Sequence, residues 1–588
     1  MSQNIVRYTL TPKDLHAHIF QVELTLDNPN PLGQVFSLPN WIPGSYLIRD
    51  FSKHIVSISA QSCGEKIAIK KLDKNHWITQ PCDENITLKY ELYAFDLSVR
   101  CAYLTNERAF FNGSSVFLKP LGFEGSSCEV VIKYPENDQS RSDWDCATTL
   151  NLSSKNNEQA TYTAKNYQDL IDHPVEMANF TRFEFKANNV PHAMTITGDH
   201  STDISRLRAD LISICKHHID FFGTEVPFDE YLFLTLVRTK GYGGLEHKNS
   251  TSLICSRKEL PTLDRPEINP DYTRFLALCS HEYFHAWWMK TIKPASFHQL
   301  DLDRENYTEQ LWIFEGLTSY YDELSLLRAG ILSPEQYLTL FAQTVTKVQK
   351  SQGRHKQSLA ESSFDAWTKF YQQDENAPNA IVSYYTKGAL LAFVLDVEIR
   401  KRTGEGQSLD DVLRYIWENY QTSGLEDNTV QNVVNDLTDS DFSEFFDNYL
   451  YGVKELPLSE AFAYVGVDCD FSHKKDDLSD FGIDVKNDNG FGIVTHVFDR
   501  TCAQSSGLYV GDKITSIDSV KTHYKDLVST IKSNNLGSVI RFGILRDELP
   551  MEISVNVEQG EKTFCTLAIS DNLNSNTLAR QKQWFAQK

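Results

Sequence analysis

The stretch DYTRFLALCSHEYFHAWWMKTI, residues 271–292, contains the pattern HEYFH, from His281 to His285, inside an amphipathic run. In a helix, positions i and i+4 share one face, so both imidazoles can reach one metal ion. Zinc suits imidazole nitrogen, and a catalytic zinc keeps one coordination position open. Glu282 follows the first histidine, where its carboxylate can take a proton from water. The alternative, a chance occurrence, is disfavoured by the amphipathic flanks, so the pattern predicts a metal centre on a helix.

A third protein ligand is expected in the stretch LWIFEGLTSYY, residues 311–321. Glu315 lies there among apolar and aromatic residues, and a buried carboxylate is costly unless a partner such as a metal ion compensates its charge. The alternative is a surface glutamate paired with a lysine. The rival ligands are Glu305, Glu309 and Glu323.

A glycine-rich stretch, GYGGLEH at residues 241–247, precedes the histidine pattern. Gly243 and Gly244 would let a strand edge approach a peptide backbone closely. The carboxylate of Glu246 can bind a protonated amino group. The alternative is a glycine-rich loop with a solvated glutamate.

The composition is that of a large globular protein. The 588 residues predict roughly three to five domains. Lysine and arginine number 57 against 79 aspartate and glutamate, a net charge of −22, which argues against nucleic acid or an anionic membrane as a main partner. The start of the chain lacks the pattern of a signal peptide, and no apolar run approaches the roughly 18 residues of a membrane span. The 11 scattered cysteines contain no CxxC pair, which favours a reducing cytoplasm.

The predicted secondary structure changes along the chain. Residues 1–165 alternate in hydrophobicity, most clearly over residues 86–92, and predict many short strands of a sandwich or curved sheet. A mixed and then largely helical zone follows. Its helices are expected over residues 271–292, 306–329, 334–350, 384–402 and 408–421.

Together, HEYFH and the later stretch EGLTSY resemble the glutamate-zincin aminopeptidases, whose pattern is HExxH followed by a helix with Glu-Gly-x-x-Ser-Tyr. The gap between His285 and Glu315, residues 286–314, is 29 residues, longer than in the commonest branch. This gap resembles the glycyl aminopeptidase family, whose members also carry a PDZ domain. The intervening residues, from Trp287 to Trp312, support that family, and the resemblance covers nearly the whole chain.

The resemblance implies one zinc ion per chain, held by His281, His285 and Glu315, with Glu282 as general base. It also implies a tyrosine that donates to the tetrahedral oxyanion, from a Tyr-x-Lys-Gly motif. Tyr385 matches that motif in the stretch YYTKG, residues 384–388. Tyr384 is the alternative if the register shifts by one, and a core tyrosine is the structural alternative.

The glycine-rich stretch is similar to the Gly-x-Met-Glu-Asn motif of related aminopeptidases. By that resemblance, Gly243, Gly244 and Glu246 bind the substrate, with Glu246 anchoring the free N-terminus. His247 stands where the related motif has asparagine, so its role stays open. The family implies a preference for small N-terminal residues, glycine and alanine.

The C-terminal zone resembles a PDZ domain. Phe481, Gly482 and Ile483 match the loop whose backbone N–H groups receive a peptide C-terminus, and residues 524–532 predict the groove helix. The alternative is a structural appendage whose groove is filled by the protein itself.

Three stretches of the N-terminal zone look like family motifs: NWIPGSY at residues 40–46, Asn112-Gly113 and DHPVE at residues 172–176. They could close a substrate cleft. We expect them instead to be turns fixed by proline and glycine, and we assign them no chemistry.

The predicted fold class is a multidomain α+β protein with an N-terminal β-sandwich-like domain, a thermolysin-like α+β zinc peptidase domain continuing into a helical region, and a C-terminal PDZ domain. The expected domains are the N-terminal β-domain (1–165), the peptidase domain (166–402), the helical C-terminal region (403–472), the PDZ domain (473–562) and a tail (563–588). The polar part of the tail, after about residue 570, is expected to be loosely held.

The expected function is zinc-dependent removal of N-terminal residues from peptides with a free amino group. The alternatives are a zinc endopeptidase or broad-range aminopeptidase on the same fold, and a catalytically silent protein whose PDZ domain recruits C-termini. The filled catalytic positions argue against the silent protein. Oligomeric state is not specified by any feature of the sequence.

Overall fold

The computed structural model describes residues 5–135, 144–223, 225–265, 267–474, 477–571 and 573–586. The ends of the expected first domain and of the expected tail, residues 1–4 and 587–588, lie outside these ranges. The chain divides into two compact units. The first comprises residues 1–306, 329–331 and 416–426, and the second comprises residues 307–328, 332–415 and 427–588.

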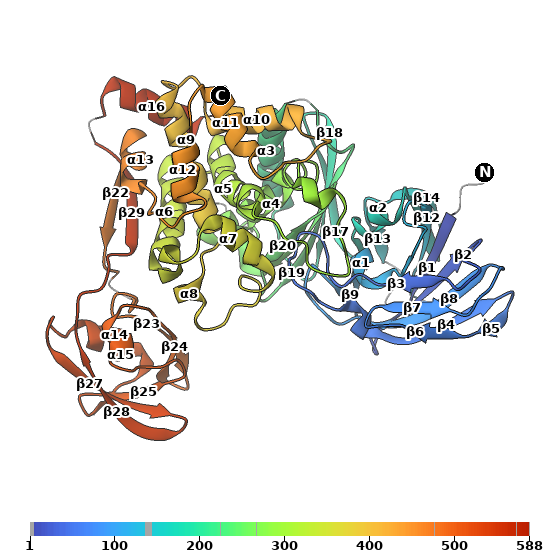
Figure 1. The fold of residues 1–588 in the computed structure, drawn as a ribbon, viewed down its shortest axis with the longest axis horizontal. Coiled ribbons are helices and arrows are strands. Elements are labelled where there is room, and N and C mark those ends of the chain that lie inside the picture. Colours follow the sequence, from blue (N-terminus) through green and yellow to red (C-terminus); the bar gives the residue numbers. More distant parts are fainter. Residues whose placement is uncertain are drawn as a thin grey trace. The chain divides into compact units, whose positions relative to one another are not determined.

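Three β-sheets form the N-terminal part of the first unit (Figure 1). The largest has eight strands in the order β14-β15-β12-β1-β2-β8-β4-β5. In β1, Val6, Tyr8 and Leu10 are buried and their neighbours are partly exposed, so one face of the strand packs into a core. The strands of this sheet are β1 (Ile5–Asp14), β2 (Ile19–Leu26), β4 (Ile55–Ser62), β5 (Glu65–Ile67), β8 (Ile86–Tyr93), β12 (Ser127–Lys133), β14 (Asn151–Lys155) and β15 (Gln159–Ala164).

The two smaller sheets have four strands each, in the orders β13-β16-β10-β9 and β11-β3-β7-β6. Because β16 pairs with β10 along its whole length, the N-terminal sheets extend past the expected boundary at residue 165, to residue 178. Short helices α1 (Gly113–Val116) and α2 (Tyr167–Ile171) accompany them. The strands are β3 (Val35–Ser37), β6 (Ile69–Lys71), β7 (His76–Thr79), β9 (Ala102–Leu104), β10 (Arg108–Phe111), β11 (Lys119–Pro120), β13 (Asp145–Ala147) and β16 (Val175–Ala178).

A five-stranded sheet follows in the same unit, in the order β17-β18-β19-β21-β20. Helices α3 (Ile204–Phe222) and α4 (Pro270–Phe284) pack on each other, and α4 contacts β20 and β21. The end strand, β20, pairs antiparallel with β21. One edge of the sheet therefore belongs to the glycine-rich stretch. The strands are β17 (Thr181–Ala187), β18 (Val190–Thr197), β19 (Tyr231–Arg238), β20 (Gly243–Glu246) and β21 (Ser250–Ser256).

Helix α4 begins as the sequence suggests and ends earlier. Asn269 caps it by accepting a hydrogen bond from the Tyr272 N–H, and Pro270 occupies the first turn. The expected helix ran to residue 292, but α4 ends at Phe284. The chain then turns, with the Ile292 N–H donating to the Trp287 carbonyl over 2.9 Å. The apolar composition of the whole stretch reflects burial of this turn rather than continued helix.

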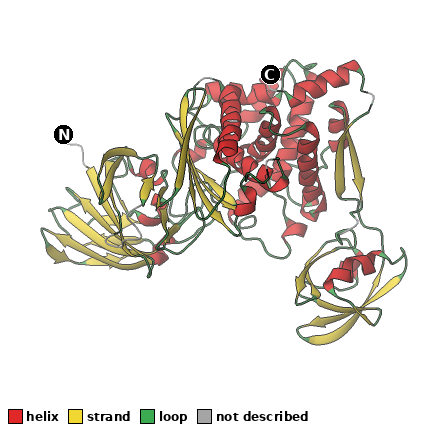
Figure 2. Ribbon diagram, turned by 180° about the vertical axis from the view of Figure 1, so that it is seen from behind, coloured by secondary structure: helices red, strands yellow, loops and turns green. Residues whose placement is uncertain are grey.

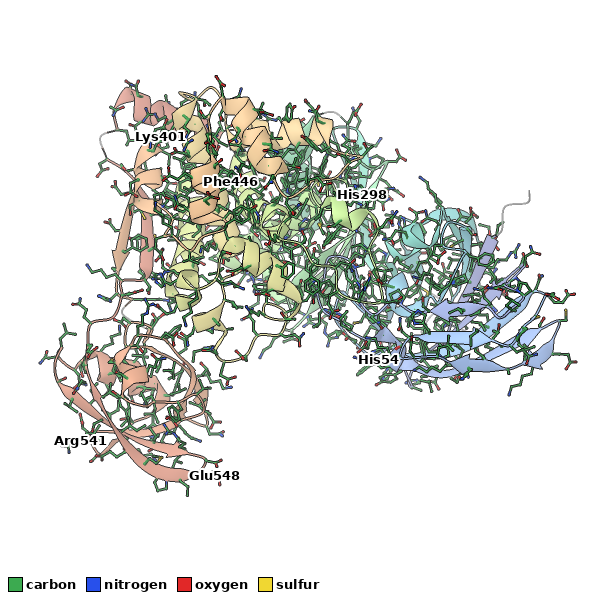
Figure 3. The ribbon with its side chains drawn as sticks, in the orientation of Figure 1. His54, His298, Lys401, Phe446, Arg541 and Glu548 are labelled. Carbon is green, nitrogen blue, oxygen red and sulfur yellow. The ribbon has the colours of Figure 1, made fainter. Side chains whose placement is uncertain are left out.

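The second unit is mainly helical before residue 465 (Figure 2). It begins with the π-helical turn η5 (Trp312–Gly316), which continues into α5. Phe446, labelled in Figure 3, lies with its ring centroid 6.3 Å from that of Trp312. The helices are α5 (Leu317–Arg328), α6 (Pro334–Lys350), α7 (Leu359–Phe364), α8 (Ala377–Ala380), α9 (Thr386–Arg402), α10 (Leu409–Asn419, whose end belongs to the first unit), α11 (Thr429–Thr438), α12 (Ser443–Tyr449) and α13 (Leu458–Tyr464).

A second β region lies between two strands that pair with each other, β22 (Val467–Ser472) and β29 (Phe564–Ile569). Its sheet has the order β23-β24-β25-β27-β28, with β26 beside β25. The sheet and helix α15 (Tyr524–Lys532) share a core that includes Ile483, Leu527 and Ile531. The other elements are β23 (Ile483–Asp488), β24 (Phe491–Val497), α14 (Cys502–Ser505), β25 (Lys513–Ile517), β26 (Val520–Lys521), β27 (Val539–Arg546) and β28 (Leu549–Asn556).

The expectation that the chain is loosely held after about residue 570 is wrong for the described part of that segment. After β29, helix α16 (Ser575–Phe585) places Trp584 in the helical core, where it has no exposed surface. Its indole N–H donates to the Tyr320 hydroxyl over 2.9 Å, and Arg328 donates to its backbone carbonyl over 3.1 Å. The polar composition of the tail concealed this single apolar anchor. Among the described residues, no helix has the length and apolar character that a membrane crossing requires.

Candidate active site

The histidines of the HEYFH pattern lie at the C-terminal end of α4. His281 is in its last turn, and His285 caps the helix with helical backbone angles, so the i, i+4 relation is kept. Their ring centroids are 4.7 Å apart. The His285 Nδ1 lies 2.9 Å from the Trp288 carbonyl, an interaction that fixes the ring and leaves Nε2 for a metal.

Glu315 completes a set of potential metal ligands. One ligand atom from each of His281, His285 and Glu315 lies within 4.8 Å of the others. Two imidazoles and a carboxylate are the donor set of a catalytic zinc site with an open position, so the residues fit that metal. The rival glutamates at positions 305, 309 and 323 do not belong to any such cluster found in the described part of the chain.

Glu282 is buried against the edge strand of the sheet. It is 5% exposed, and a Cβ added to Gly244 would lie 2.1 Å from its Oε1. The Tyr231 hydroxyl donates to the Glu282 backbone carbonyl over 3.2 Å. The backbone of β20 therefore passes directly over the Glu282 carboxylate, and only glycine fits at position 244.

Glu246 ends β20 and is 4% exposed. A Cβ on Gly44 would lie 2.5 Å from one of its carboxylate oxygens and 2.6 Å from the other. Gly243 opens the strand, and the Gly244 carbonyl accepts a hydrogen bond from Arg100 over 3.2 Å. Thus Gly44 and Arg100, both in turns of the N-terminal β region, approach β20, and Gly44 lies against the carboxylate that the sequence singled out.

The two candidate tyrosines precede α9 and differ in exposure. Tyr384 has no exposed surface, whereas Tyr385 is partly exposed and is the N-terminal cap residue of α9. Their rings stack with centroids 4.7 Å apart, and Phe370 packs on both. The Tyr385 N–H donates to the Ser383 hydroxyl over 3.2 Å. Only Tyr385 of the pair has surface available to a substrate.

Glycines bring the helix of Glu315 close to the helix that follows Tyr385. A Cβ on Gly316 would lie 2.7 Å from the Cα of Gly388, so η5 and α9 contact through their backbones. Lys387 is buried beside this contact, and burial lowers the pKa of its ammonium to about 8. The glycines that follow Glu315 and Lys387 are thus both required by the same close contact between η5 and α9.

The predicted peptide-binding loop at residues 481–483 has its backbone donors already bonded. The N–H groups of Phe481, Gly482 and Ile483 each donate to the Leu478 carbonyl oxygen, over 3.0, 2.9 and 3.2 Å. A cavity of about 480 Å³ borders Phe481 and the end of α15. A peptide carboxylate at this loop would have to replace the Leu478 carbonyl.

Sequence reasoning missed three features of the site. Gly44 lies against Glu246, and Asp172 Oδ1 lies 3.2 Å from Nδ1 of His247. Both residues belong to stretches that were expected to be turns, and nothing in their local pattern indicated contact with the glycine-rich stretch. The His285 ring is oriented by the backbone carbonyl of Trp288. A pattern of side chains in the sequence gives no indication of such a backbone contact.

Comparison with known protein families gives three matches along the chain. Residues 7–179 match the peptidase M61 N-terminal domain, residues 274–391 match the M61 glycyl aminopeptidase, and residues 479–557 match a PDZ domain. A search of curated proteins gave no match.

A solved structure is similar over nearly the whole chain. It is the crystal structure of an aminopeptidase N family protein from Idiomarina loihiensis, with 38% sequence identity and a TM-score of 0.94, covering 99% of this chain and 100% of that one. Fold, metal-ligand cluster and matches define a zinc metallopeptidase of the aminopeptidase type with the expected multidomain α+β architecture. The chain belongs to the M61 glycyl aminopeptidase family and carries a PDZ domain.

Two further solved structures match the chain at low sequence identity. The M1 zinc metallopeptidase from Deinococcus radiodurans is 12% identical, with a TM-score of 0.47, and the match covers 78% of this chain and 95% of that one. Yeast LTA4 hydrolase in complex with bestatin is 13% identical, with a TM-score of 0.46, and the match covers 77% of this chain and 68% of that one.

Proposed function

We propose that this zinc aminopeptidase removes single N-terminal residues, preferentially glycine and alanine, from peptides with a free amino group. The observation that carries the proposal is the convergence of ligand atoms from His281, His285 and Glu315 within 4.8 Å. The match to the M61 glycyl aminopeptidase supports the small-residue preference. We assign one zinc ion per chain to this ligand set.

The roles of the protein groups follow from their positions. When bound, zinc supplies Lewis acidity at the scissile carbonyl and the attacking water. The Glu282 carboxylate accepts a proton from that water and delivers it to the leaving amine. The Tyr385 hydroxyl donates a hydrogen bond to the oxyanion of the tetrahedral intermediate.

The exopeptidase character depends on Glu246. Its carboxylate would accept hydrogen bonds from the substrate ammonium, so that one residue fits before the cleaved bond. Gly243 and Gly244 would let the edge strand approach the substrate backbone. An N-acetylated substrate has no ammonium for Glu246 to bind, which separates this function from an endopeptidase.

The test is hydrolysis of glycine and alanine p-nitroanilides, each with and without N-acetylation, before and after chelation. We expect cleavage of the free-amine forms only, lost on chelation and restored by zinc. Cleavage of the acetylated forms would indicate an endopeptidase. Equal rates on larger residues such as leucine would indicate a broad-range aminopeptidase. With metal shown to be bound, inactivity on all the free-amine substrates would contradict the proposal.

A Tyr385→Phe variant tests the oxyanion donor. We expect kcat to fall by about 10²-fold, because one hydrogen bond to the developing negative charge is lost. The matched control is Tyr384→Phe, whose buried hydroxyl lies on the neighbouring ring; kcat should change far less. A larger loss in Tyr384→Phe would shift the assignment by one residue.

Two accompanying proposals concern the rest of the chain. We assign the cavity beside Phe481, with Gly482 and Ile483, as a second peptide site in the PDZ domain, open to a C-terminus that displaces the Leu478 carbonyl. We also propose a cytoplasmic location, supported by the free state of all 11 cysteines. The negative net charge gives no basis for nucleic acid or anionic membrane as partners.

A further inference from the structure

We propose that Asp172 and Gly44, both in the N-terminal β region, are positioning residues that hold Glu246 in place for the substrate amino group. The inference rests on the proposed role of Glu246. It assigns a function to the two stretches, residues 40–46 and 172–176, that the sequence alone left as turns.

Asp172 joins two segments of the peptidase core. It follows α2, and its Oδ1 accepts a hydrogen bond from the Lys290 ammonium over 2.7 Å. The same oxygen lies 3.2 Å from Nδ1 of His247, the residue directly after Glu246. Because His247 is 1% exposed, its ring has little freedom to move away from this partner.

The protonation states of Asp172 and His247 favour the hydrogen bond between them. Burial opposes ionisation of Asp172, but Lys290 and His247 outweigh burial and hold the pKa of this carboxyl below its usual range. Burial lowers the pKa of His247, so its ring is neutral at neutral pH and donates its Nδ1–H to the carboxylate. A buried ionic hydrogen bond of this kind sets the orientation of what it holds.

Lys290 carries the connection to the metal ligands. Its backbone N–H donates to the His285 carbonyl over 3.0 Å, closing the turn after α4. Asp172 therefore links the end of the strand that carries Glu246 to the turn that follows His285. A shift of the Asp172 carboxylate would therefore move Glu246, the proposed anchor of the substrate amine, relative to helix α4.

Gly44 confines Glu246 from a second direction. Its φ of 89° is a conformation that favours glycine, and an added Cβ would overlap both carboxylate oxygens of Glu246. The Glu246 carboxylate is thus bounded by Gly44 on one side, while its neighbour His247 is held by Asp172.

A cavity of about 340 Å³ borders this cluster. Gly44, Asp172, Glu246 and Lys290 line it together with the exposed His298, which is labelled in Figure 3. The positioning residues therefore lie at a space that solutes can enter, where the amino end of a substrate could meet Glu246.

The experiment compares two zinc-binding inhibitors, glycine hydroxamate, which has a free amine, and acetohydroxamate, which lacks it. The inhibition constant of acetohydroxamate divided by that of glycine hydroxamate measures how much the amine alone contributes to binding. We expect Asp172→Asn to reduce this ratio by about tenfold, as for other residues that orient a site. The affinity for acetohydroxamate should stay unchanged.

Reference variants separate this inference from the proposed function. Glu246→Gln should reduce the ratio at least as much as Asp172→Asn does. In the double variant the ratio should be close to that of Glu246→Gln alone, because both substitutions act on the same anchor. Asp210→Asn is the matched control, because Asp210 also forms an ion pair, with Arg206, but lies on α3 instead. It should leave the ratio unchanged.

Each outcome decides one of the two claims. If Glu246→Gln leaves the ratio unchanged, the proposed amine anchor is wrong. If Glu246→Gln reduces it but Asp172→Asn does not, or if Asp172→Asn weakens both inhibitors equally, the positioning role is overturned. Should Asp172→Asn fail to fold, His247→Phe tests the same connection, because phenylalanine keeps a ring of similar size but has no donor for Asp172. This variant should also reduce the ratio.

Discussion

A Glu282→Gln variant is expected to lose about 10³- to 10⁴-fold in kcat while retaining its metal, because glutamine cannot accept the proton of the attacking water. Glutamine has nearly the same shape as glutamate. It therefore fits the space below Gly244, where the backbone leaves no room for a larger change. Kinetics on alanine p-nitroanilide and metal analysis of the same preparation provide the measurement.

The matched control for this variant is Glu259→Gln. Glu259 is also buried, at 2% exposure, but it serves a capping box and an ion pair with Arg274. Its replacement should affect stability and leave kcat within a few-fold of the original. Substantial activity in Glu282→Gln would overturn the role of Glu282 as base, and loss of the metal would assign it a structural role instead.

A Glu315→Gln variant is expected to bind zinc at least about 10²-fold more weakly, because an anionic ligand becomes neutral. Activity at limiting zinc should fall with occupancy. The stabilisation that zinc gives to the folded state should fall too, since ligand binding stabilises in proportion to RT ln(1 + [L]/Kd). Zinc titration against a competing chelator and the zinc dependence of Tm measure both effects.

Glu323→Gln is the control, because Glu323 lies on α5, which directly continues η5. Burial raises the pKa of Glu323, so its neutral form is favoured and replacement by glutamine should cost little. Loss of zinc affinity in Glu323→Gln, with Glu315→Gln unaffected, would transfer the ligand role.

Local patterns predicted the parts of the site that depend on neighbours in sequence. The spacing of His281 and His285 needs only one helical turn, and Glu315 needs only an apolar environment around a carboxylate. Gly316 and Gly388 show the limit of such reasoning. Gly316 belongs to the stretch EGLTSY and Gly388 to the stretch YYTKG, but no local pattern indicates the backbone contact between these two distant segments.

Features that depend on distant segments were missed for the same reason. The contact of Gly44 with Glu246 joins a turn of the N-terminal β region to the end of β20 and has no periodic signal in either stretch. The end of α4 at Phe284 depends on the burial of Trp287 and Trp288 in a turn, which an apolar run cannot distinguish from helix. The burial of Trp584 depends on a pocket formed by helices far earlier in the chain.

Because β22 pairs with β29, the PDZ domain is inserted between two paired strands of the peptidase rather than appended to its C-terminus. The chain departs through Ser472 and returns beside it at Phe564, since these residues face each other in the ladder. Excision of the module with a short turn in its place would leave the entry and exit strands in register. Truncation from the C-terminus would instead remove β29 and the Trp584 anchor, so a stop codon near residue 560 is more harmful to the peptidase than an internal deletion that removes more residues.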